Sequence, residues 1–334
     1  MSDYTIAWLQ IHFCVFLWGF TAIIGRLTGM AAMELVLWRM VLVAGVLLAI
    51  PRVWRGLGRL SPRLLLQFSG IGVLVALHWI SFYGSVKLAN ASVTATCMAT
   101  APIFMSVIEP LVTGKRFDRK ELLLGVLVLP GMALVVGGTP EQMNAGIALG
   151  VLAALLAALF GACNKLLILQ TDSLTATGVE MSSGAVTVLA IILGMSLMPA
   201  MADLDATVFI SFYDLWRIPS GADLLLLVVL ALACTLLPFA LSLKAMRHLS
   251  AYATVLAVNL EPIYAMILAM LILAEQQELN GSFYLGALII LAVVFCYPVL
   301  TRKERREANR QNRQAKLTNP EAQPATLVND RPGD

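Results

Sequence analysis

Long apolar stretches separated by short polar segments occupy most of this chain. Ten such stretches cover about 7–25, 33–51, 64–83, 91–113, 121–138, 146–169, 177–199, 223–243, 251–274 and 281–301. A helix of roughly 20 apolar residues crosses a hydrocarbon core about 30 Å thick. The stretches lack the period-two alternation that is typical of barrel strands. The pattern therefore predicts an all-α polytopic membrane protein with ten transmembrane helices.

One short pattern occurs twice along the chain. Residues 91–94 (ASVT) precede Pro102, and residues 251–254 (AYAT) precede Pro262; 251 minus 91 and 262 minus 102 are both 160. The cations that precede the two segments, at the same offset, are Lys87 and Arg247. The repetition predicts two units of five spans each.

The predicted repeats cover residues 7–138 and 146–301, and a tail over residues 302–334 follows them. A unit of five spans that occurs twice must enter the membrane in opposite orientations. Inverted repeats are the architecture of secondary transporters, which bind their substrate at the repeat interface. The interpretation is a carrier that lies in the lipid bilayer and has a small-molecule substrate.

Composition agrees with a membrane protein. Hydrophobic residues make up 59% of the chain and charged residues 13%, against roughly 45–50% and 25% in soluble domains. All five cysteines lie inside predicted spans, without the spacing of a metal site or a redox pair. No metal and no cofactor are therefore expected. No basic segment or cleavage site accompanies the first span, so we expect it to be retained.

Positive charge is distributed unevenly between the loops. The loops after the second and fourth spans and the start of the tail contain Arg52, Arg55, Arg59, Arg63, Lys115, Arg116, Arg119, Lys120, Arg302, Lys303, Arg305 and Arg306. Because Lys and Arg accumulate in cytoplasmic loops, both termini are predicted to be cytoplasmic, in a bacterial inner membrane. The net charge of +3 reflects this topology, and no nucleic-acid partner is expected. The basic tail turns Asn-, Pro- and Ala-rich after residue 317, which predicts disorder.

Several segments resemble EamA-type carriers of the drug/metabolite transporter superfamily. Trp18-Gly19 resembles the pair that opens the first EamA repeat. The segments that resemble the closing half of the second repeat are 251–254, 260–263, 274–275 and 286–289. The resemblance covers essentially residues 7–301 and implies ten helices in two repeats, with movement, most often export, of small metabolites such as amino acids or drugs. One departure is Lys115, where the family usually has an acidic residue.

Charged residues inside the predicted spans are candidates for the transport path, because a charge at a helix centre costs at least about 2.5–3.5 kcal/mol. Arg39 either anchors a substrate carboxylate through its planar donor fork, or snorkels or pairs with Glu34. Both interpretations stay open. Glu109, near a basic pair at the end of the fourth span, is predicted to be a helix cap or gate, with a proton carrier as the alternative.

Glu261 lies near the middle of the ninth span, beside Pro262. It is predicted to be a substrate-amine or proton site, and a hydrogen-bonded strut beside a proline kink is the alternative. The matched Pro102 and Pro262 are predicted to kink the fourth and ninth spans toward one central volume.

The third and fourth spans contain further polar and aromatic candidates. Trp79 and Tyr83 are four residues apart and form an aromatic strip, while His78 is either a hydrogen-bonded packing residue or a pH-responsive group. Thr96 and Thr100 either line a polar cavity or bond back to the preceding turn. The remaining candidates for the transport path are Trp18, Asn164, Tyr252 and Asn259.

The longest loop, residues 201–222, contains aromatic residues at helical spacing. They are Phe209, Phe212, Tyr213 and Trp216. The spacing predicts a short amphipathic helix in the outer membrane interface. A mobile lid over the outward opening is the alternative.

These features bear on three functional classes. A secondary transporter, working by alternating access around a site formed by the first, third, fourth, sixth, eighth and ninth spans, accounts for the repeat. A multi-pass receptor or scaffold without transport activity is the alternative. The chain lacks the His-Glu-x-x-His, Gly-x-Ser-x-Gly and Walker A motifs, which argues against an enzyme and against direct ATP coupling. Proton coupling through Glu261 or His78, facilitated diffusion and the oligomeric state all stay open.

Overall fold

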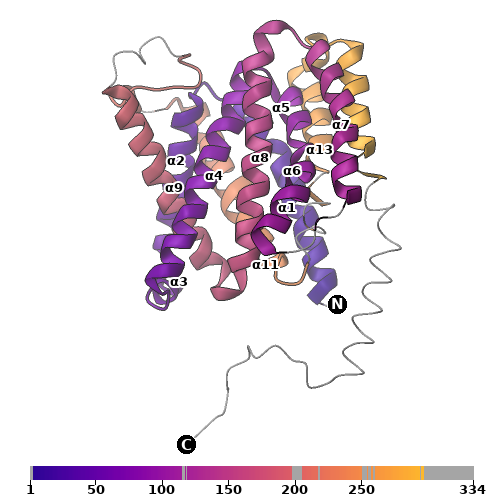
Figure 1. Cartoon of the computed structure of the whole chain (residues 1–334). Helices are drawn as coiled ribbons and strands as arrows, with labels where there is room; N and C mark the ends of the chain where they lie inside the picture. Colours follow the sequence, from indigo (N-terminus) through magenta and orange to yellow (C-terminus); the bar gives the residue numbers. More distant parts are fainter. Residues whose placement is uncertain are drawn as a thin grey trace, which may run out of the picture. The chain divides into compact units, whose positions relative to one another are not determined.

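The computed structural model describes residues 3–114, 117, 119–197, 205–216, 219–249, 254, 257–258, 260–293 and 295–296. These residues form helices and contain no strand, so the all-helical prediction is confirmed for them. The long helices run side by side (Figure 1). The helices considered below belong to the unit formed by residues 1–294.

The described part of the first half contains seven helices. They are α1 (Asp3–Leu27), α2 (Ala32–Leu48), α3 (Pro51–Leu57), α4 (Pro62–Leu88), α5 (Ala91–Met98), α6 (Ala101–Thr113) and α7 (Arg119–Gly137). Helix starts follow local chemistry: the Ser61 hydroxyl accepts from Leu64 N ahead of α4, and the Asn90 side chain accepts from Val93 N ahead of α5. The sequence thus specifies these starts directly.

The second half repeats this arrangement with more interruptions. It contains η1 (Glu141–Met143), α8 (Asn144–Leu167), η2 (Ile168–Gln170), α9 (Ser173–Ser196), η4 (Asp214–Trp216), α10 (Gly221–Ala231), η5 (Leu232–Leu236), α11 (Leu237–Ala245), α13 (Glu261–Leu268), η6 (Ala269–Leu273) and η7 (Glu275–Gln277). A last apolar helix covers Gly281–Val293. Both η5 and η6 are π-helical turns, in the segments that correspond to the eighth and ninth predicted spans.

The predicted count of ten spans is not confirmed. Among the described residues, six helical segments are long and apolar enough to cross a membrane, and α2 with α3 makes a seventh if that pair is one span. The α2–α3 pair bends by 92°, because Pro51 holds the preceding Ile50 in an extended conformation. Three further apolar helices are shorter: Val126–Gly137, Glu261–Leu273 and Gly281–Val293.

Each of these shorter helices is part of a longer predicted span. Val126–Gly137 is the C-terminal part of α7, which covers Arg119–Gly137. Much of the first half of the predicted ninth span and the end of the tenth lie outside the described residues. The chain is nevertheless a multi-pass membrane protein.

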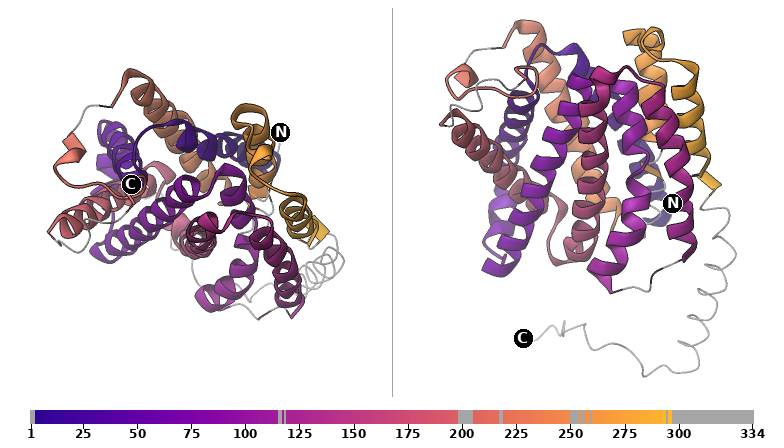
Figure 2. Two further views of the ribbon diagram at one scale, coloured as in Figure 1. Left: turned by 90° about the horizontal axis from the view of Figure 1, so that it is seen from above. Right: turned by 45° about the horizontal axis from the view of Figure 1, so that its top comes forward.

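The two halves interlock at their first helices. Helix α1 packs against α11 and α13 of the second half, while α8 packs against α4, α5 and α6 of the first half. Helices α2 and α9, the second of each half, pack against each other. Figure 2, left, looks down on the bundle from above. The centre of the bundle is therefore built from both halves.

Small residues allow the closest helix contacts. A Cβ atom on Gly72 of α4 would lie 2.3 Å from the carbonyl oxygen of Glu180 in α9, and one on Gly286 would lie 2.5 Å from the carbonyl oxygen of Gly131. Since lipid tails are as apolar as side chains, membrane helices associate through such close packing. Substituting Gly72 would push α4 away from α9.

The matched cations Lys87 and Arg247 have equivalent roles. The Lys87 ammonium donates to the carbonyl of Thr28, just after α1, at 2.6 Å. The Arg247 guanidinium donates to the carbonyls of Ile168, at 3.3 Å, and Thr171, just after α8. In each half a cation thus satisfies carbonyl groups at the end of the first helix.

Both matched prolines lie at helix interruptions. Helix α5 ends at Met98 and α6 begins at Ala101, with Pro102 in its first turn. Helix α13 begins at Glu261, with Pro262 in its first turn. Proline lacks an N–H and is tolerated there, because first-turn N–H groups have no partner inside the helix. The predicted kink of both spans toward one central volume stays a prediction.

The predicted amphipathic helix in the long loop is wrong. Among residues 205–216, only η4 is helical. Asp205 accepts hydrogen bonds from the backbone and hydroxyl of Thr207, a local pattern that competes with helix formation. The expected stripe is also divided: Phe209 and Phe212 pack against the core, whereas Tyr213 and Trp216 are 86% and 65% exposed.

Candidate functional site

A cavity of about 170 Å³ lies at the centre of the bundle, where the two halves meet. Its wall comes from α1, α2, α4, α5, α6, α8, α11 and α13 and from positions 246, 254 and 258. The six spans expected to form the site all contribute, and α2 contributes Arg39 in addition. The charged and polar lining includes Arg39, His78, Tyr83, Asn164 and Glu261, and the aromatic lining includes Trp18, Trp79, Phe82, Phe160 and Phe239.

Arg39 is held inside the bundle by three partners. Its Nη1 donates to the Tyr83 hydroxyl at 2.7 Å, its Nε donates to the Thr235 hydroxyl, and its guanidinium carbon lies 3.7 Å from the centre of the Trp79 ring. The side chain is only 2% exposed, so it does not snorkel. The suggested ion pair with Glu34 is wrong, because the Glu34 carboxylate accepts from the backbone N–H of Ala31 at the start of α2.

The π-helical turn η5 supplies the Arg39 contact from the second half. Within it, Thr235 donates its hydroxyl proton to the carbonyl of Leu230 at 2.6 Å and accepts from Arg39. A guanidinium has five N–H donors. Two of them are used in these bonds, and Nη2 has no partner within the described part of the chain. Donors therefore remain for a ligand in the cavity.

Glu261 places a carboxyl group on the same cavity, at the start of α13. Among the described residues, only Arg26 and Glu278 come within 4.0 Å as a cation–carboxylate pair. Arg39 and Glu261 thus line one cavity without contacting each other. The cavity thus contains two groups of opposite charge that do not pair with each other.

The His78 ring packs against aromatic side chains and also lines the cavity. Its Nδ1 lies 2.8 Å from the carbonyl oxygen of Ala153, and a carbonyl only accepts, so Nδ1 carries the proton. The ring contacts Phe160 edge-on at 5.3 Å and Phe82 at 6.1 Å between centroids. The structure brings Trp18, Trp79 and Tyr83 to the same cavity, as it does Asn164 and Pro262.

Other sequence candidates lie off the cavity. Thr96 and Thr100 donate to the carbonyls of Ser92, at 2.9 Å, and Cys97, at 2.6 Å, which is the back-bonded alternative. Pro102 does not line the cavity, although the adjacent Ala101 does. Glu109 lies in α6 and does not line it either. Tyr252 and Asn259 fall outside the described residues.

Two residues that sequence reasoning missed belong to this region. Phe239 lines the cavity and meets Trp79 edge-on, with 6.3 Å between centroids. Since 239 minus 79 is 160, the repeat offset was a usable signal. Glu180, the only acidic residue in the predicted span 177–199, accepts from the cavity-lining Asn164 at 3.4 Å. A lone carboxyl group in an apolar span is also a signal.

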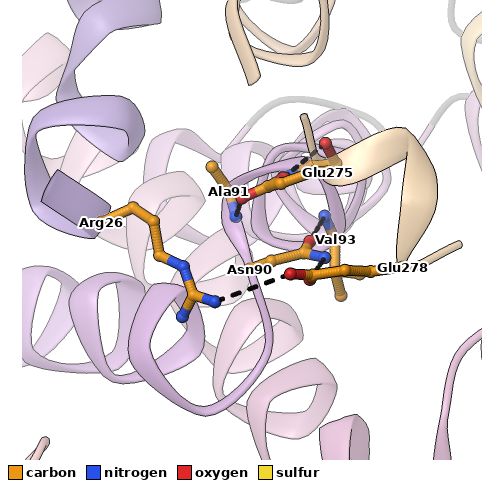
Figure 3. A network of polar contacts seen from close by, with 7 residues as sticks. Arg26, Asn90, Ala91, Val93, Glu275 and Glu278 are labelled. Carbon is orange, nitrogen blue, oxygen red and sulfur yellow. Dashed lines mark hydrogen bonds and ion pairs between the residues drawn. The ribbon is translucent and has the colours of Figure 1, made fainter. Parts of the chain in front are cut away.

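A polar network, the Glu275 cluster, joins segments of the two halves (Figure 3). We define it as Arg26, Asn90, Ala91, Ser92, Glu275 and Glu278. Glu275, 1% exposed, accepts from Ala91 N at 2.9 Å, from Ser92 N at 2.8 Å and from the Ser92 hydroxyl at 2.7 Å. A carboxylate from the second half therefore caps the positive end of α5 in the first half.

The turn before Glu275 and a second carboxylate complete the cluster. Ala274 adopts a left-handed conformation, with φ 54° and ψ 29°, where the chain leaves η6. Such a conformation is rare for a residue other than glycine, and here it precedes the capping residue. Glu278 accepts from the Asn90 amide at 3.1 Å and lies 3.9 Å from Arg26. The cluster joins α1, α5 and the end of the α13 segment.

The helical bundle, with two matching halves around a central cavity, defines a multi-pass membrane protein built from repeats. The EamA-like transporter family matches this sequence over residues 5–137 and again over residues 144–297. The chain therefore belongs to the EamA family of the drug/metabolite transporter superfamily, and the suspected resemblance is confirmed. Members of this family are transporters.

Comparison with solved structures supports the fold. Twenty-one chains of solved structures match this one. One of them, described only as a crystal structure of a protein, is 15% identical and has a TM-score of 0.57. The match covers 90% of this chain and 98% of the other. At this identity the likeness shows the fold alone. No curated protein matches the sequence.

Proposed function

We propose that this EamA-family protein is a secondary transporter that exports a small metabolite, of the amino-acid or drug class, by alternating access. The observation that carries the proposal is the cavity between the two halves, which holds a cation and a carboxyl group that do not pair. Burying such groups away from water is costly. A ligand that satisfies both would offset that cost, whereas a scaffold would have no use for them.

The lining points to the chemistry of the substrate. Arg39 has donors left for a carboxylate, and Glu261 suits an ammonium group. Aromatic side chains, among them Trp18 and Phe82, cover much of the remaining wall. A zwitterion with an apolar side chain matches this combination.

The Glu275 cluster is proposed to be one of two gates. It joins the first half to the second at one end of the bundle, so the cavity opens toward that end only when these hydrogen bonds break. The matched position in the first half, 275 minus 160, is Lys115. Lysine accepts no hydrogen bond, so an equivalent cap cannot form at the other end. The two gates therefore differ in strength.

The proposed orientation places both termini in the cytoplasm of a bacterial inner membrane. Single cysteines at Arg55, Arg116 and Arg305, in a chain without native cysteines, should react only from the cytoplasmic side. Cysteines at positions 142, 205 and 277 should react only from outside. Any position that reacts from the opposite side contradicts the orientation.

Counterflow in proteoliposomes tests transport and substrate class together. Vesicles that contain the full-length protein are loaded with phenylalanine, with its amide, which lacks the carboxylate, or with N-acetylphenylalanine, which lacks the ammonium group. Labelled phenylalanine should exchange with the intact amino acid and poorly with either derivative. A set of cationic drugs is measured in parallel, since the proposal includes that class.

Two cavity variants and two matched controls complete the experiment. Arg39→Met should remove the preference for phenylalanine over its amide, and Glu261→Gln the preference over the N-acetyl derivative. Arg52→Met and Glu141→Gln change exposed residues of the same types and should behave as wild type. Binding of these compounds without counterflow would favour the receptor alternative, and no binding at all would overturn the proposed function.

A further inference from the structure

Glu180, in α9, is a buried carboxyl group that the proposed substrate site does not use. It is 0% exposed, and its Oε2 accepts from Nδ2 of Asn164, itself 1% exposed, at 3.4 Å. The other oxygens, Oε1 of Glu180 and Oδ1 of Asn164, are buried and have no hydrogen-bond partner among the described residues. Two acceptors cannot satisfy each other, so an added donor or cation is required.

The surrounding helices isolate this pair from lipid and from the loops. The backbone of α4 at Gly72 lies directly against Glu180. One turn further along α9, Gly184 is covered by Met40 of α2, whose Cε would lie 2.4 Å from an added Cβ. Asn164 lines the central cavity, whereas Glu180 does not. The carboxyl group is therefore linked to the cavity through the Asn164 amide.

The charged and titratable groups on the helices around this pair are engaged elsewhere or exposed. Arg39 donates to the hydroxyls of Tyr83 and Thr235, and Glu34 accepts from the Ala31 N–H. Backbone carbonyls are the partners of His78 (Ala153), Lys87 (Thr28) and Lys165 (Met246 and Leu249). The remaining cations are exposed: Arg52, Arg55, Arg63 and Lys244. No cation lies within 4.0 Å of Glu180 in the described part of the chain. Glu180 therefore has no counter-ion there.

An ionised carboxylate in such surroundings is costly, because the lost hydration is not replaced by a paired charge. A proton taken up from water removes the charge and makes the carboxyl group a hydrogen-bond donor. We propose that Glu180 is a proton-binding site, separate from Glu261, and that Asn164 links its protonation to the contents of the cavity. Uptake forms one O–H bond on Glu180, and release returns that proton to water.

The link to the cavity rests on the proposed function, but proton binding does not. A ligand donor that reaches Oδ1 of Asn164 would compete with the Glu180 hydroxyl for that acceptor. Occupation of the cavity would then favour release of the proton. A second acidic site outside the substrate cavity would let proton and substrate be exchanged without direct contact.

Infrared spectroscopy of the purified full-length protein tests the proton site without any substrate. A protonated carboxyl group has a carbonyl band that a carboxylate lacks. The spectrum of wild type at neutral pH should contain a band of this kind that Glu180→Gln loses and Glu261→Gln retains. Glutamine has nearly the same shape and can donate to Asn164, so we expect this variant to fold. Asn164→Ala should shift the same band, because its hydrogen-bond partner is gone.

Each outcome decides between the alternatives. A spectrum that Glu180→Gln leaves unchanged in this region means an ionised or purely structural Glu180 and overturns the proposal. A band that vanishes when sodium replaces choline at constant pH assigns the site to a metal cation and overturns it too. If Glu180→Gln cannot be purified, an unchanged band in Asn164→Ala overturns it. Failure of transport in every vesicle assay would reject the carrier while leaving the infrared result standing.

Discussion

The cavity wall built by α4 differs from the wall built by α11, although both helices occupy the same place in their repeats. Residues of α4 and α11 that are 160 positions apart and both line the cavity are Trp79 and Phe239, Phe82 and Ser242, and Tyr83 and Leu243. Helix α4 supplies the ring and the hydroxyl that hold Arg39, whereas the matched α11 positions supply Phe239 and Leu243. The two repeats thus place side chains at matching positions on the cavity, but these side chains differ in their chemistry.

The same contrast appears between α6 and α13. Ala101 and Glu261 are matched positions, and both line the cavity, but only one carries a charge. The cations Lys87 and Arg247, by comparison, keep the same bonding role in both halves. The two cations thus have the same bonding role in both halves, whereas these matched residues that face the cavity differ. Because the two halves line the cavity with different side chains, the cavity can orient a ligand whose two ends differ.

The largest expected effect concerns the Glu275 cluster, whose capping carboxylate corresponds to Lys115 at the matched position of the first half. Glu275→Ala removes three hydrogen bonds to a buried carboxylate, each of which contributes about 1.5–3 kcal/mol. We expect a loss of stability of about 3 kcal/mol or more, measured by unfolding of the purified protein in detergent. Glu278→Ala, at a half-exposed pair, should cost about 1 kcal/mol or less. Equal losses in the two variants would contradict a dominant role for Glu275.

Glu261→Gln tests the difference between the matched positions 101 and 261. It should lower transport by about tenfold or more, the equivalent of about 1.4 kcal/mol, or uncouple it, while the folded protein stays in the membrane. The reason is that the amide cannot attract an ammonium group or carry a proton. Ala101→Ser, a small polar change at the matched position, should have little effect. Wild-type rates and pH dependence in Glu261→Gln would leave it a structural strut.

Substitutions of Trp79 and Phe239 test whether these two contacting rings have the same role in transport. Trp79→Leu removes a cation–π contact with Arg39 that contributes about 0.5–2 kcal/mol. Apparent substrate affinity in the counterflow assay should fall by about fivefold, which corresponds to about 1 kcal/mol. Phe239→Leu keeps Arg39 in place and should have a smaller effect. The opposite order would show that Arg39 is positioned by its hydrogen bonds alone.

The matched prolines give the smallest expected difference. On symmetry alone, Pro102→Ala and Pro262→Ala should impair transport alike. Only Pro262 lines the cavity, so we expect Pro262→Ala to lower the transport rate by about threefold more than Pro102→Ala, the equivalent of about 0.6 kcal/mol. Transport normalised to the amount of folded protein measures this. Normal rates in both variants would place the moving elements elsewhere.

Sequence reasoning anticipated the parts of the site that depend on position along a helix. The apolar spans, the repeat offset and the lone charges brought out Arg39, His78 and Glu261, and all three line the cavity. It did not find Thr235, nor that Trp79 and Tyr83 contact Arg39. Those contacts join α2 to α4 and to η5, and no pattern along one helix records which side chain of another helix lies opposite.

Sequence-based predictions were also wrong where two local patterns compete. Aromatic residues at helical spacing predicted a helix in the long loop, but the Asp205–Thr207 hydrogen bonds and the burial of Phe209 gave an irregular chain. Span counting assumed ten helices of spanning length, whereas three of the apolar helices in the described part of the chain are shorter. The sequence left open whether the Thr96 and Thr100 hydroxyls line a cavity or bond back to the preceding turn. Both hydroxyls donate to nearby backbone carbonyls.

By itself the sequence determined the membrane class, the two repeats and the EamA family, because apolar length and repeated motifs are properties of contiguous segments. Tertiary structure alone decided that α1 and α8 each pack into the other half and that Asn164 meets Glu180. It also decided that a carboxylate of the second half caps α5. These contacts join segments far apart in the chain, and their geometry follows from how the helices pack.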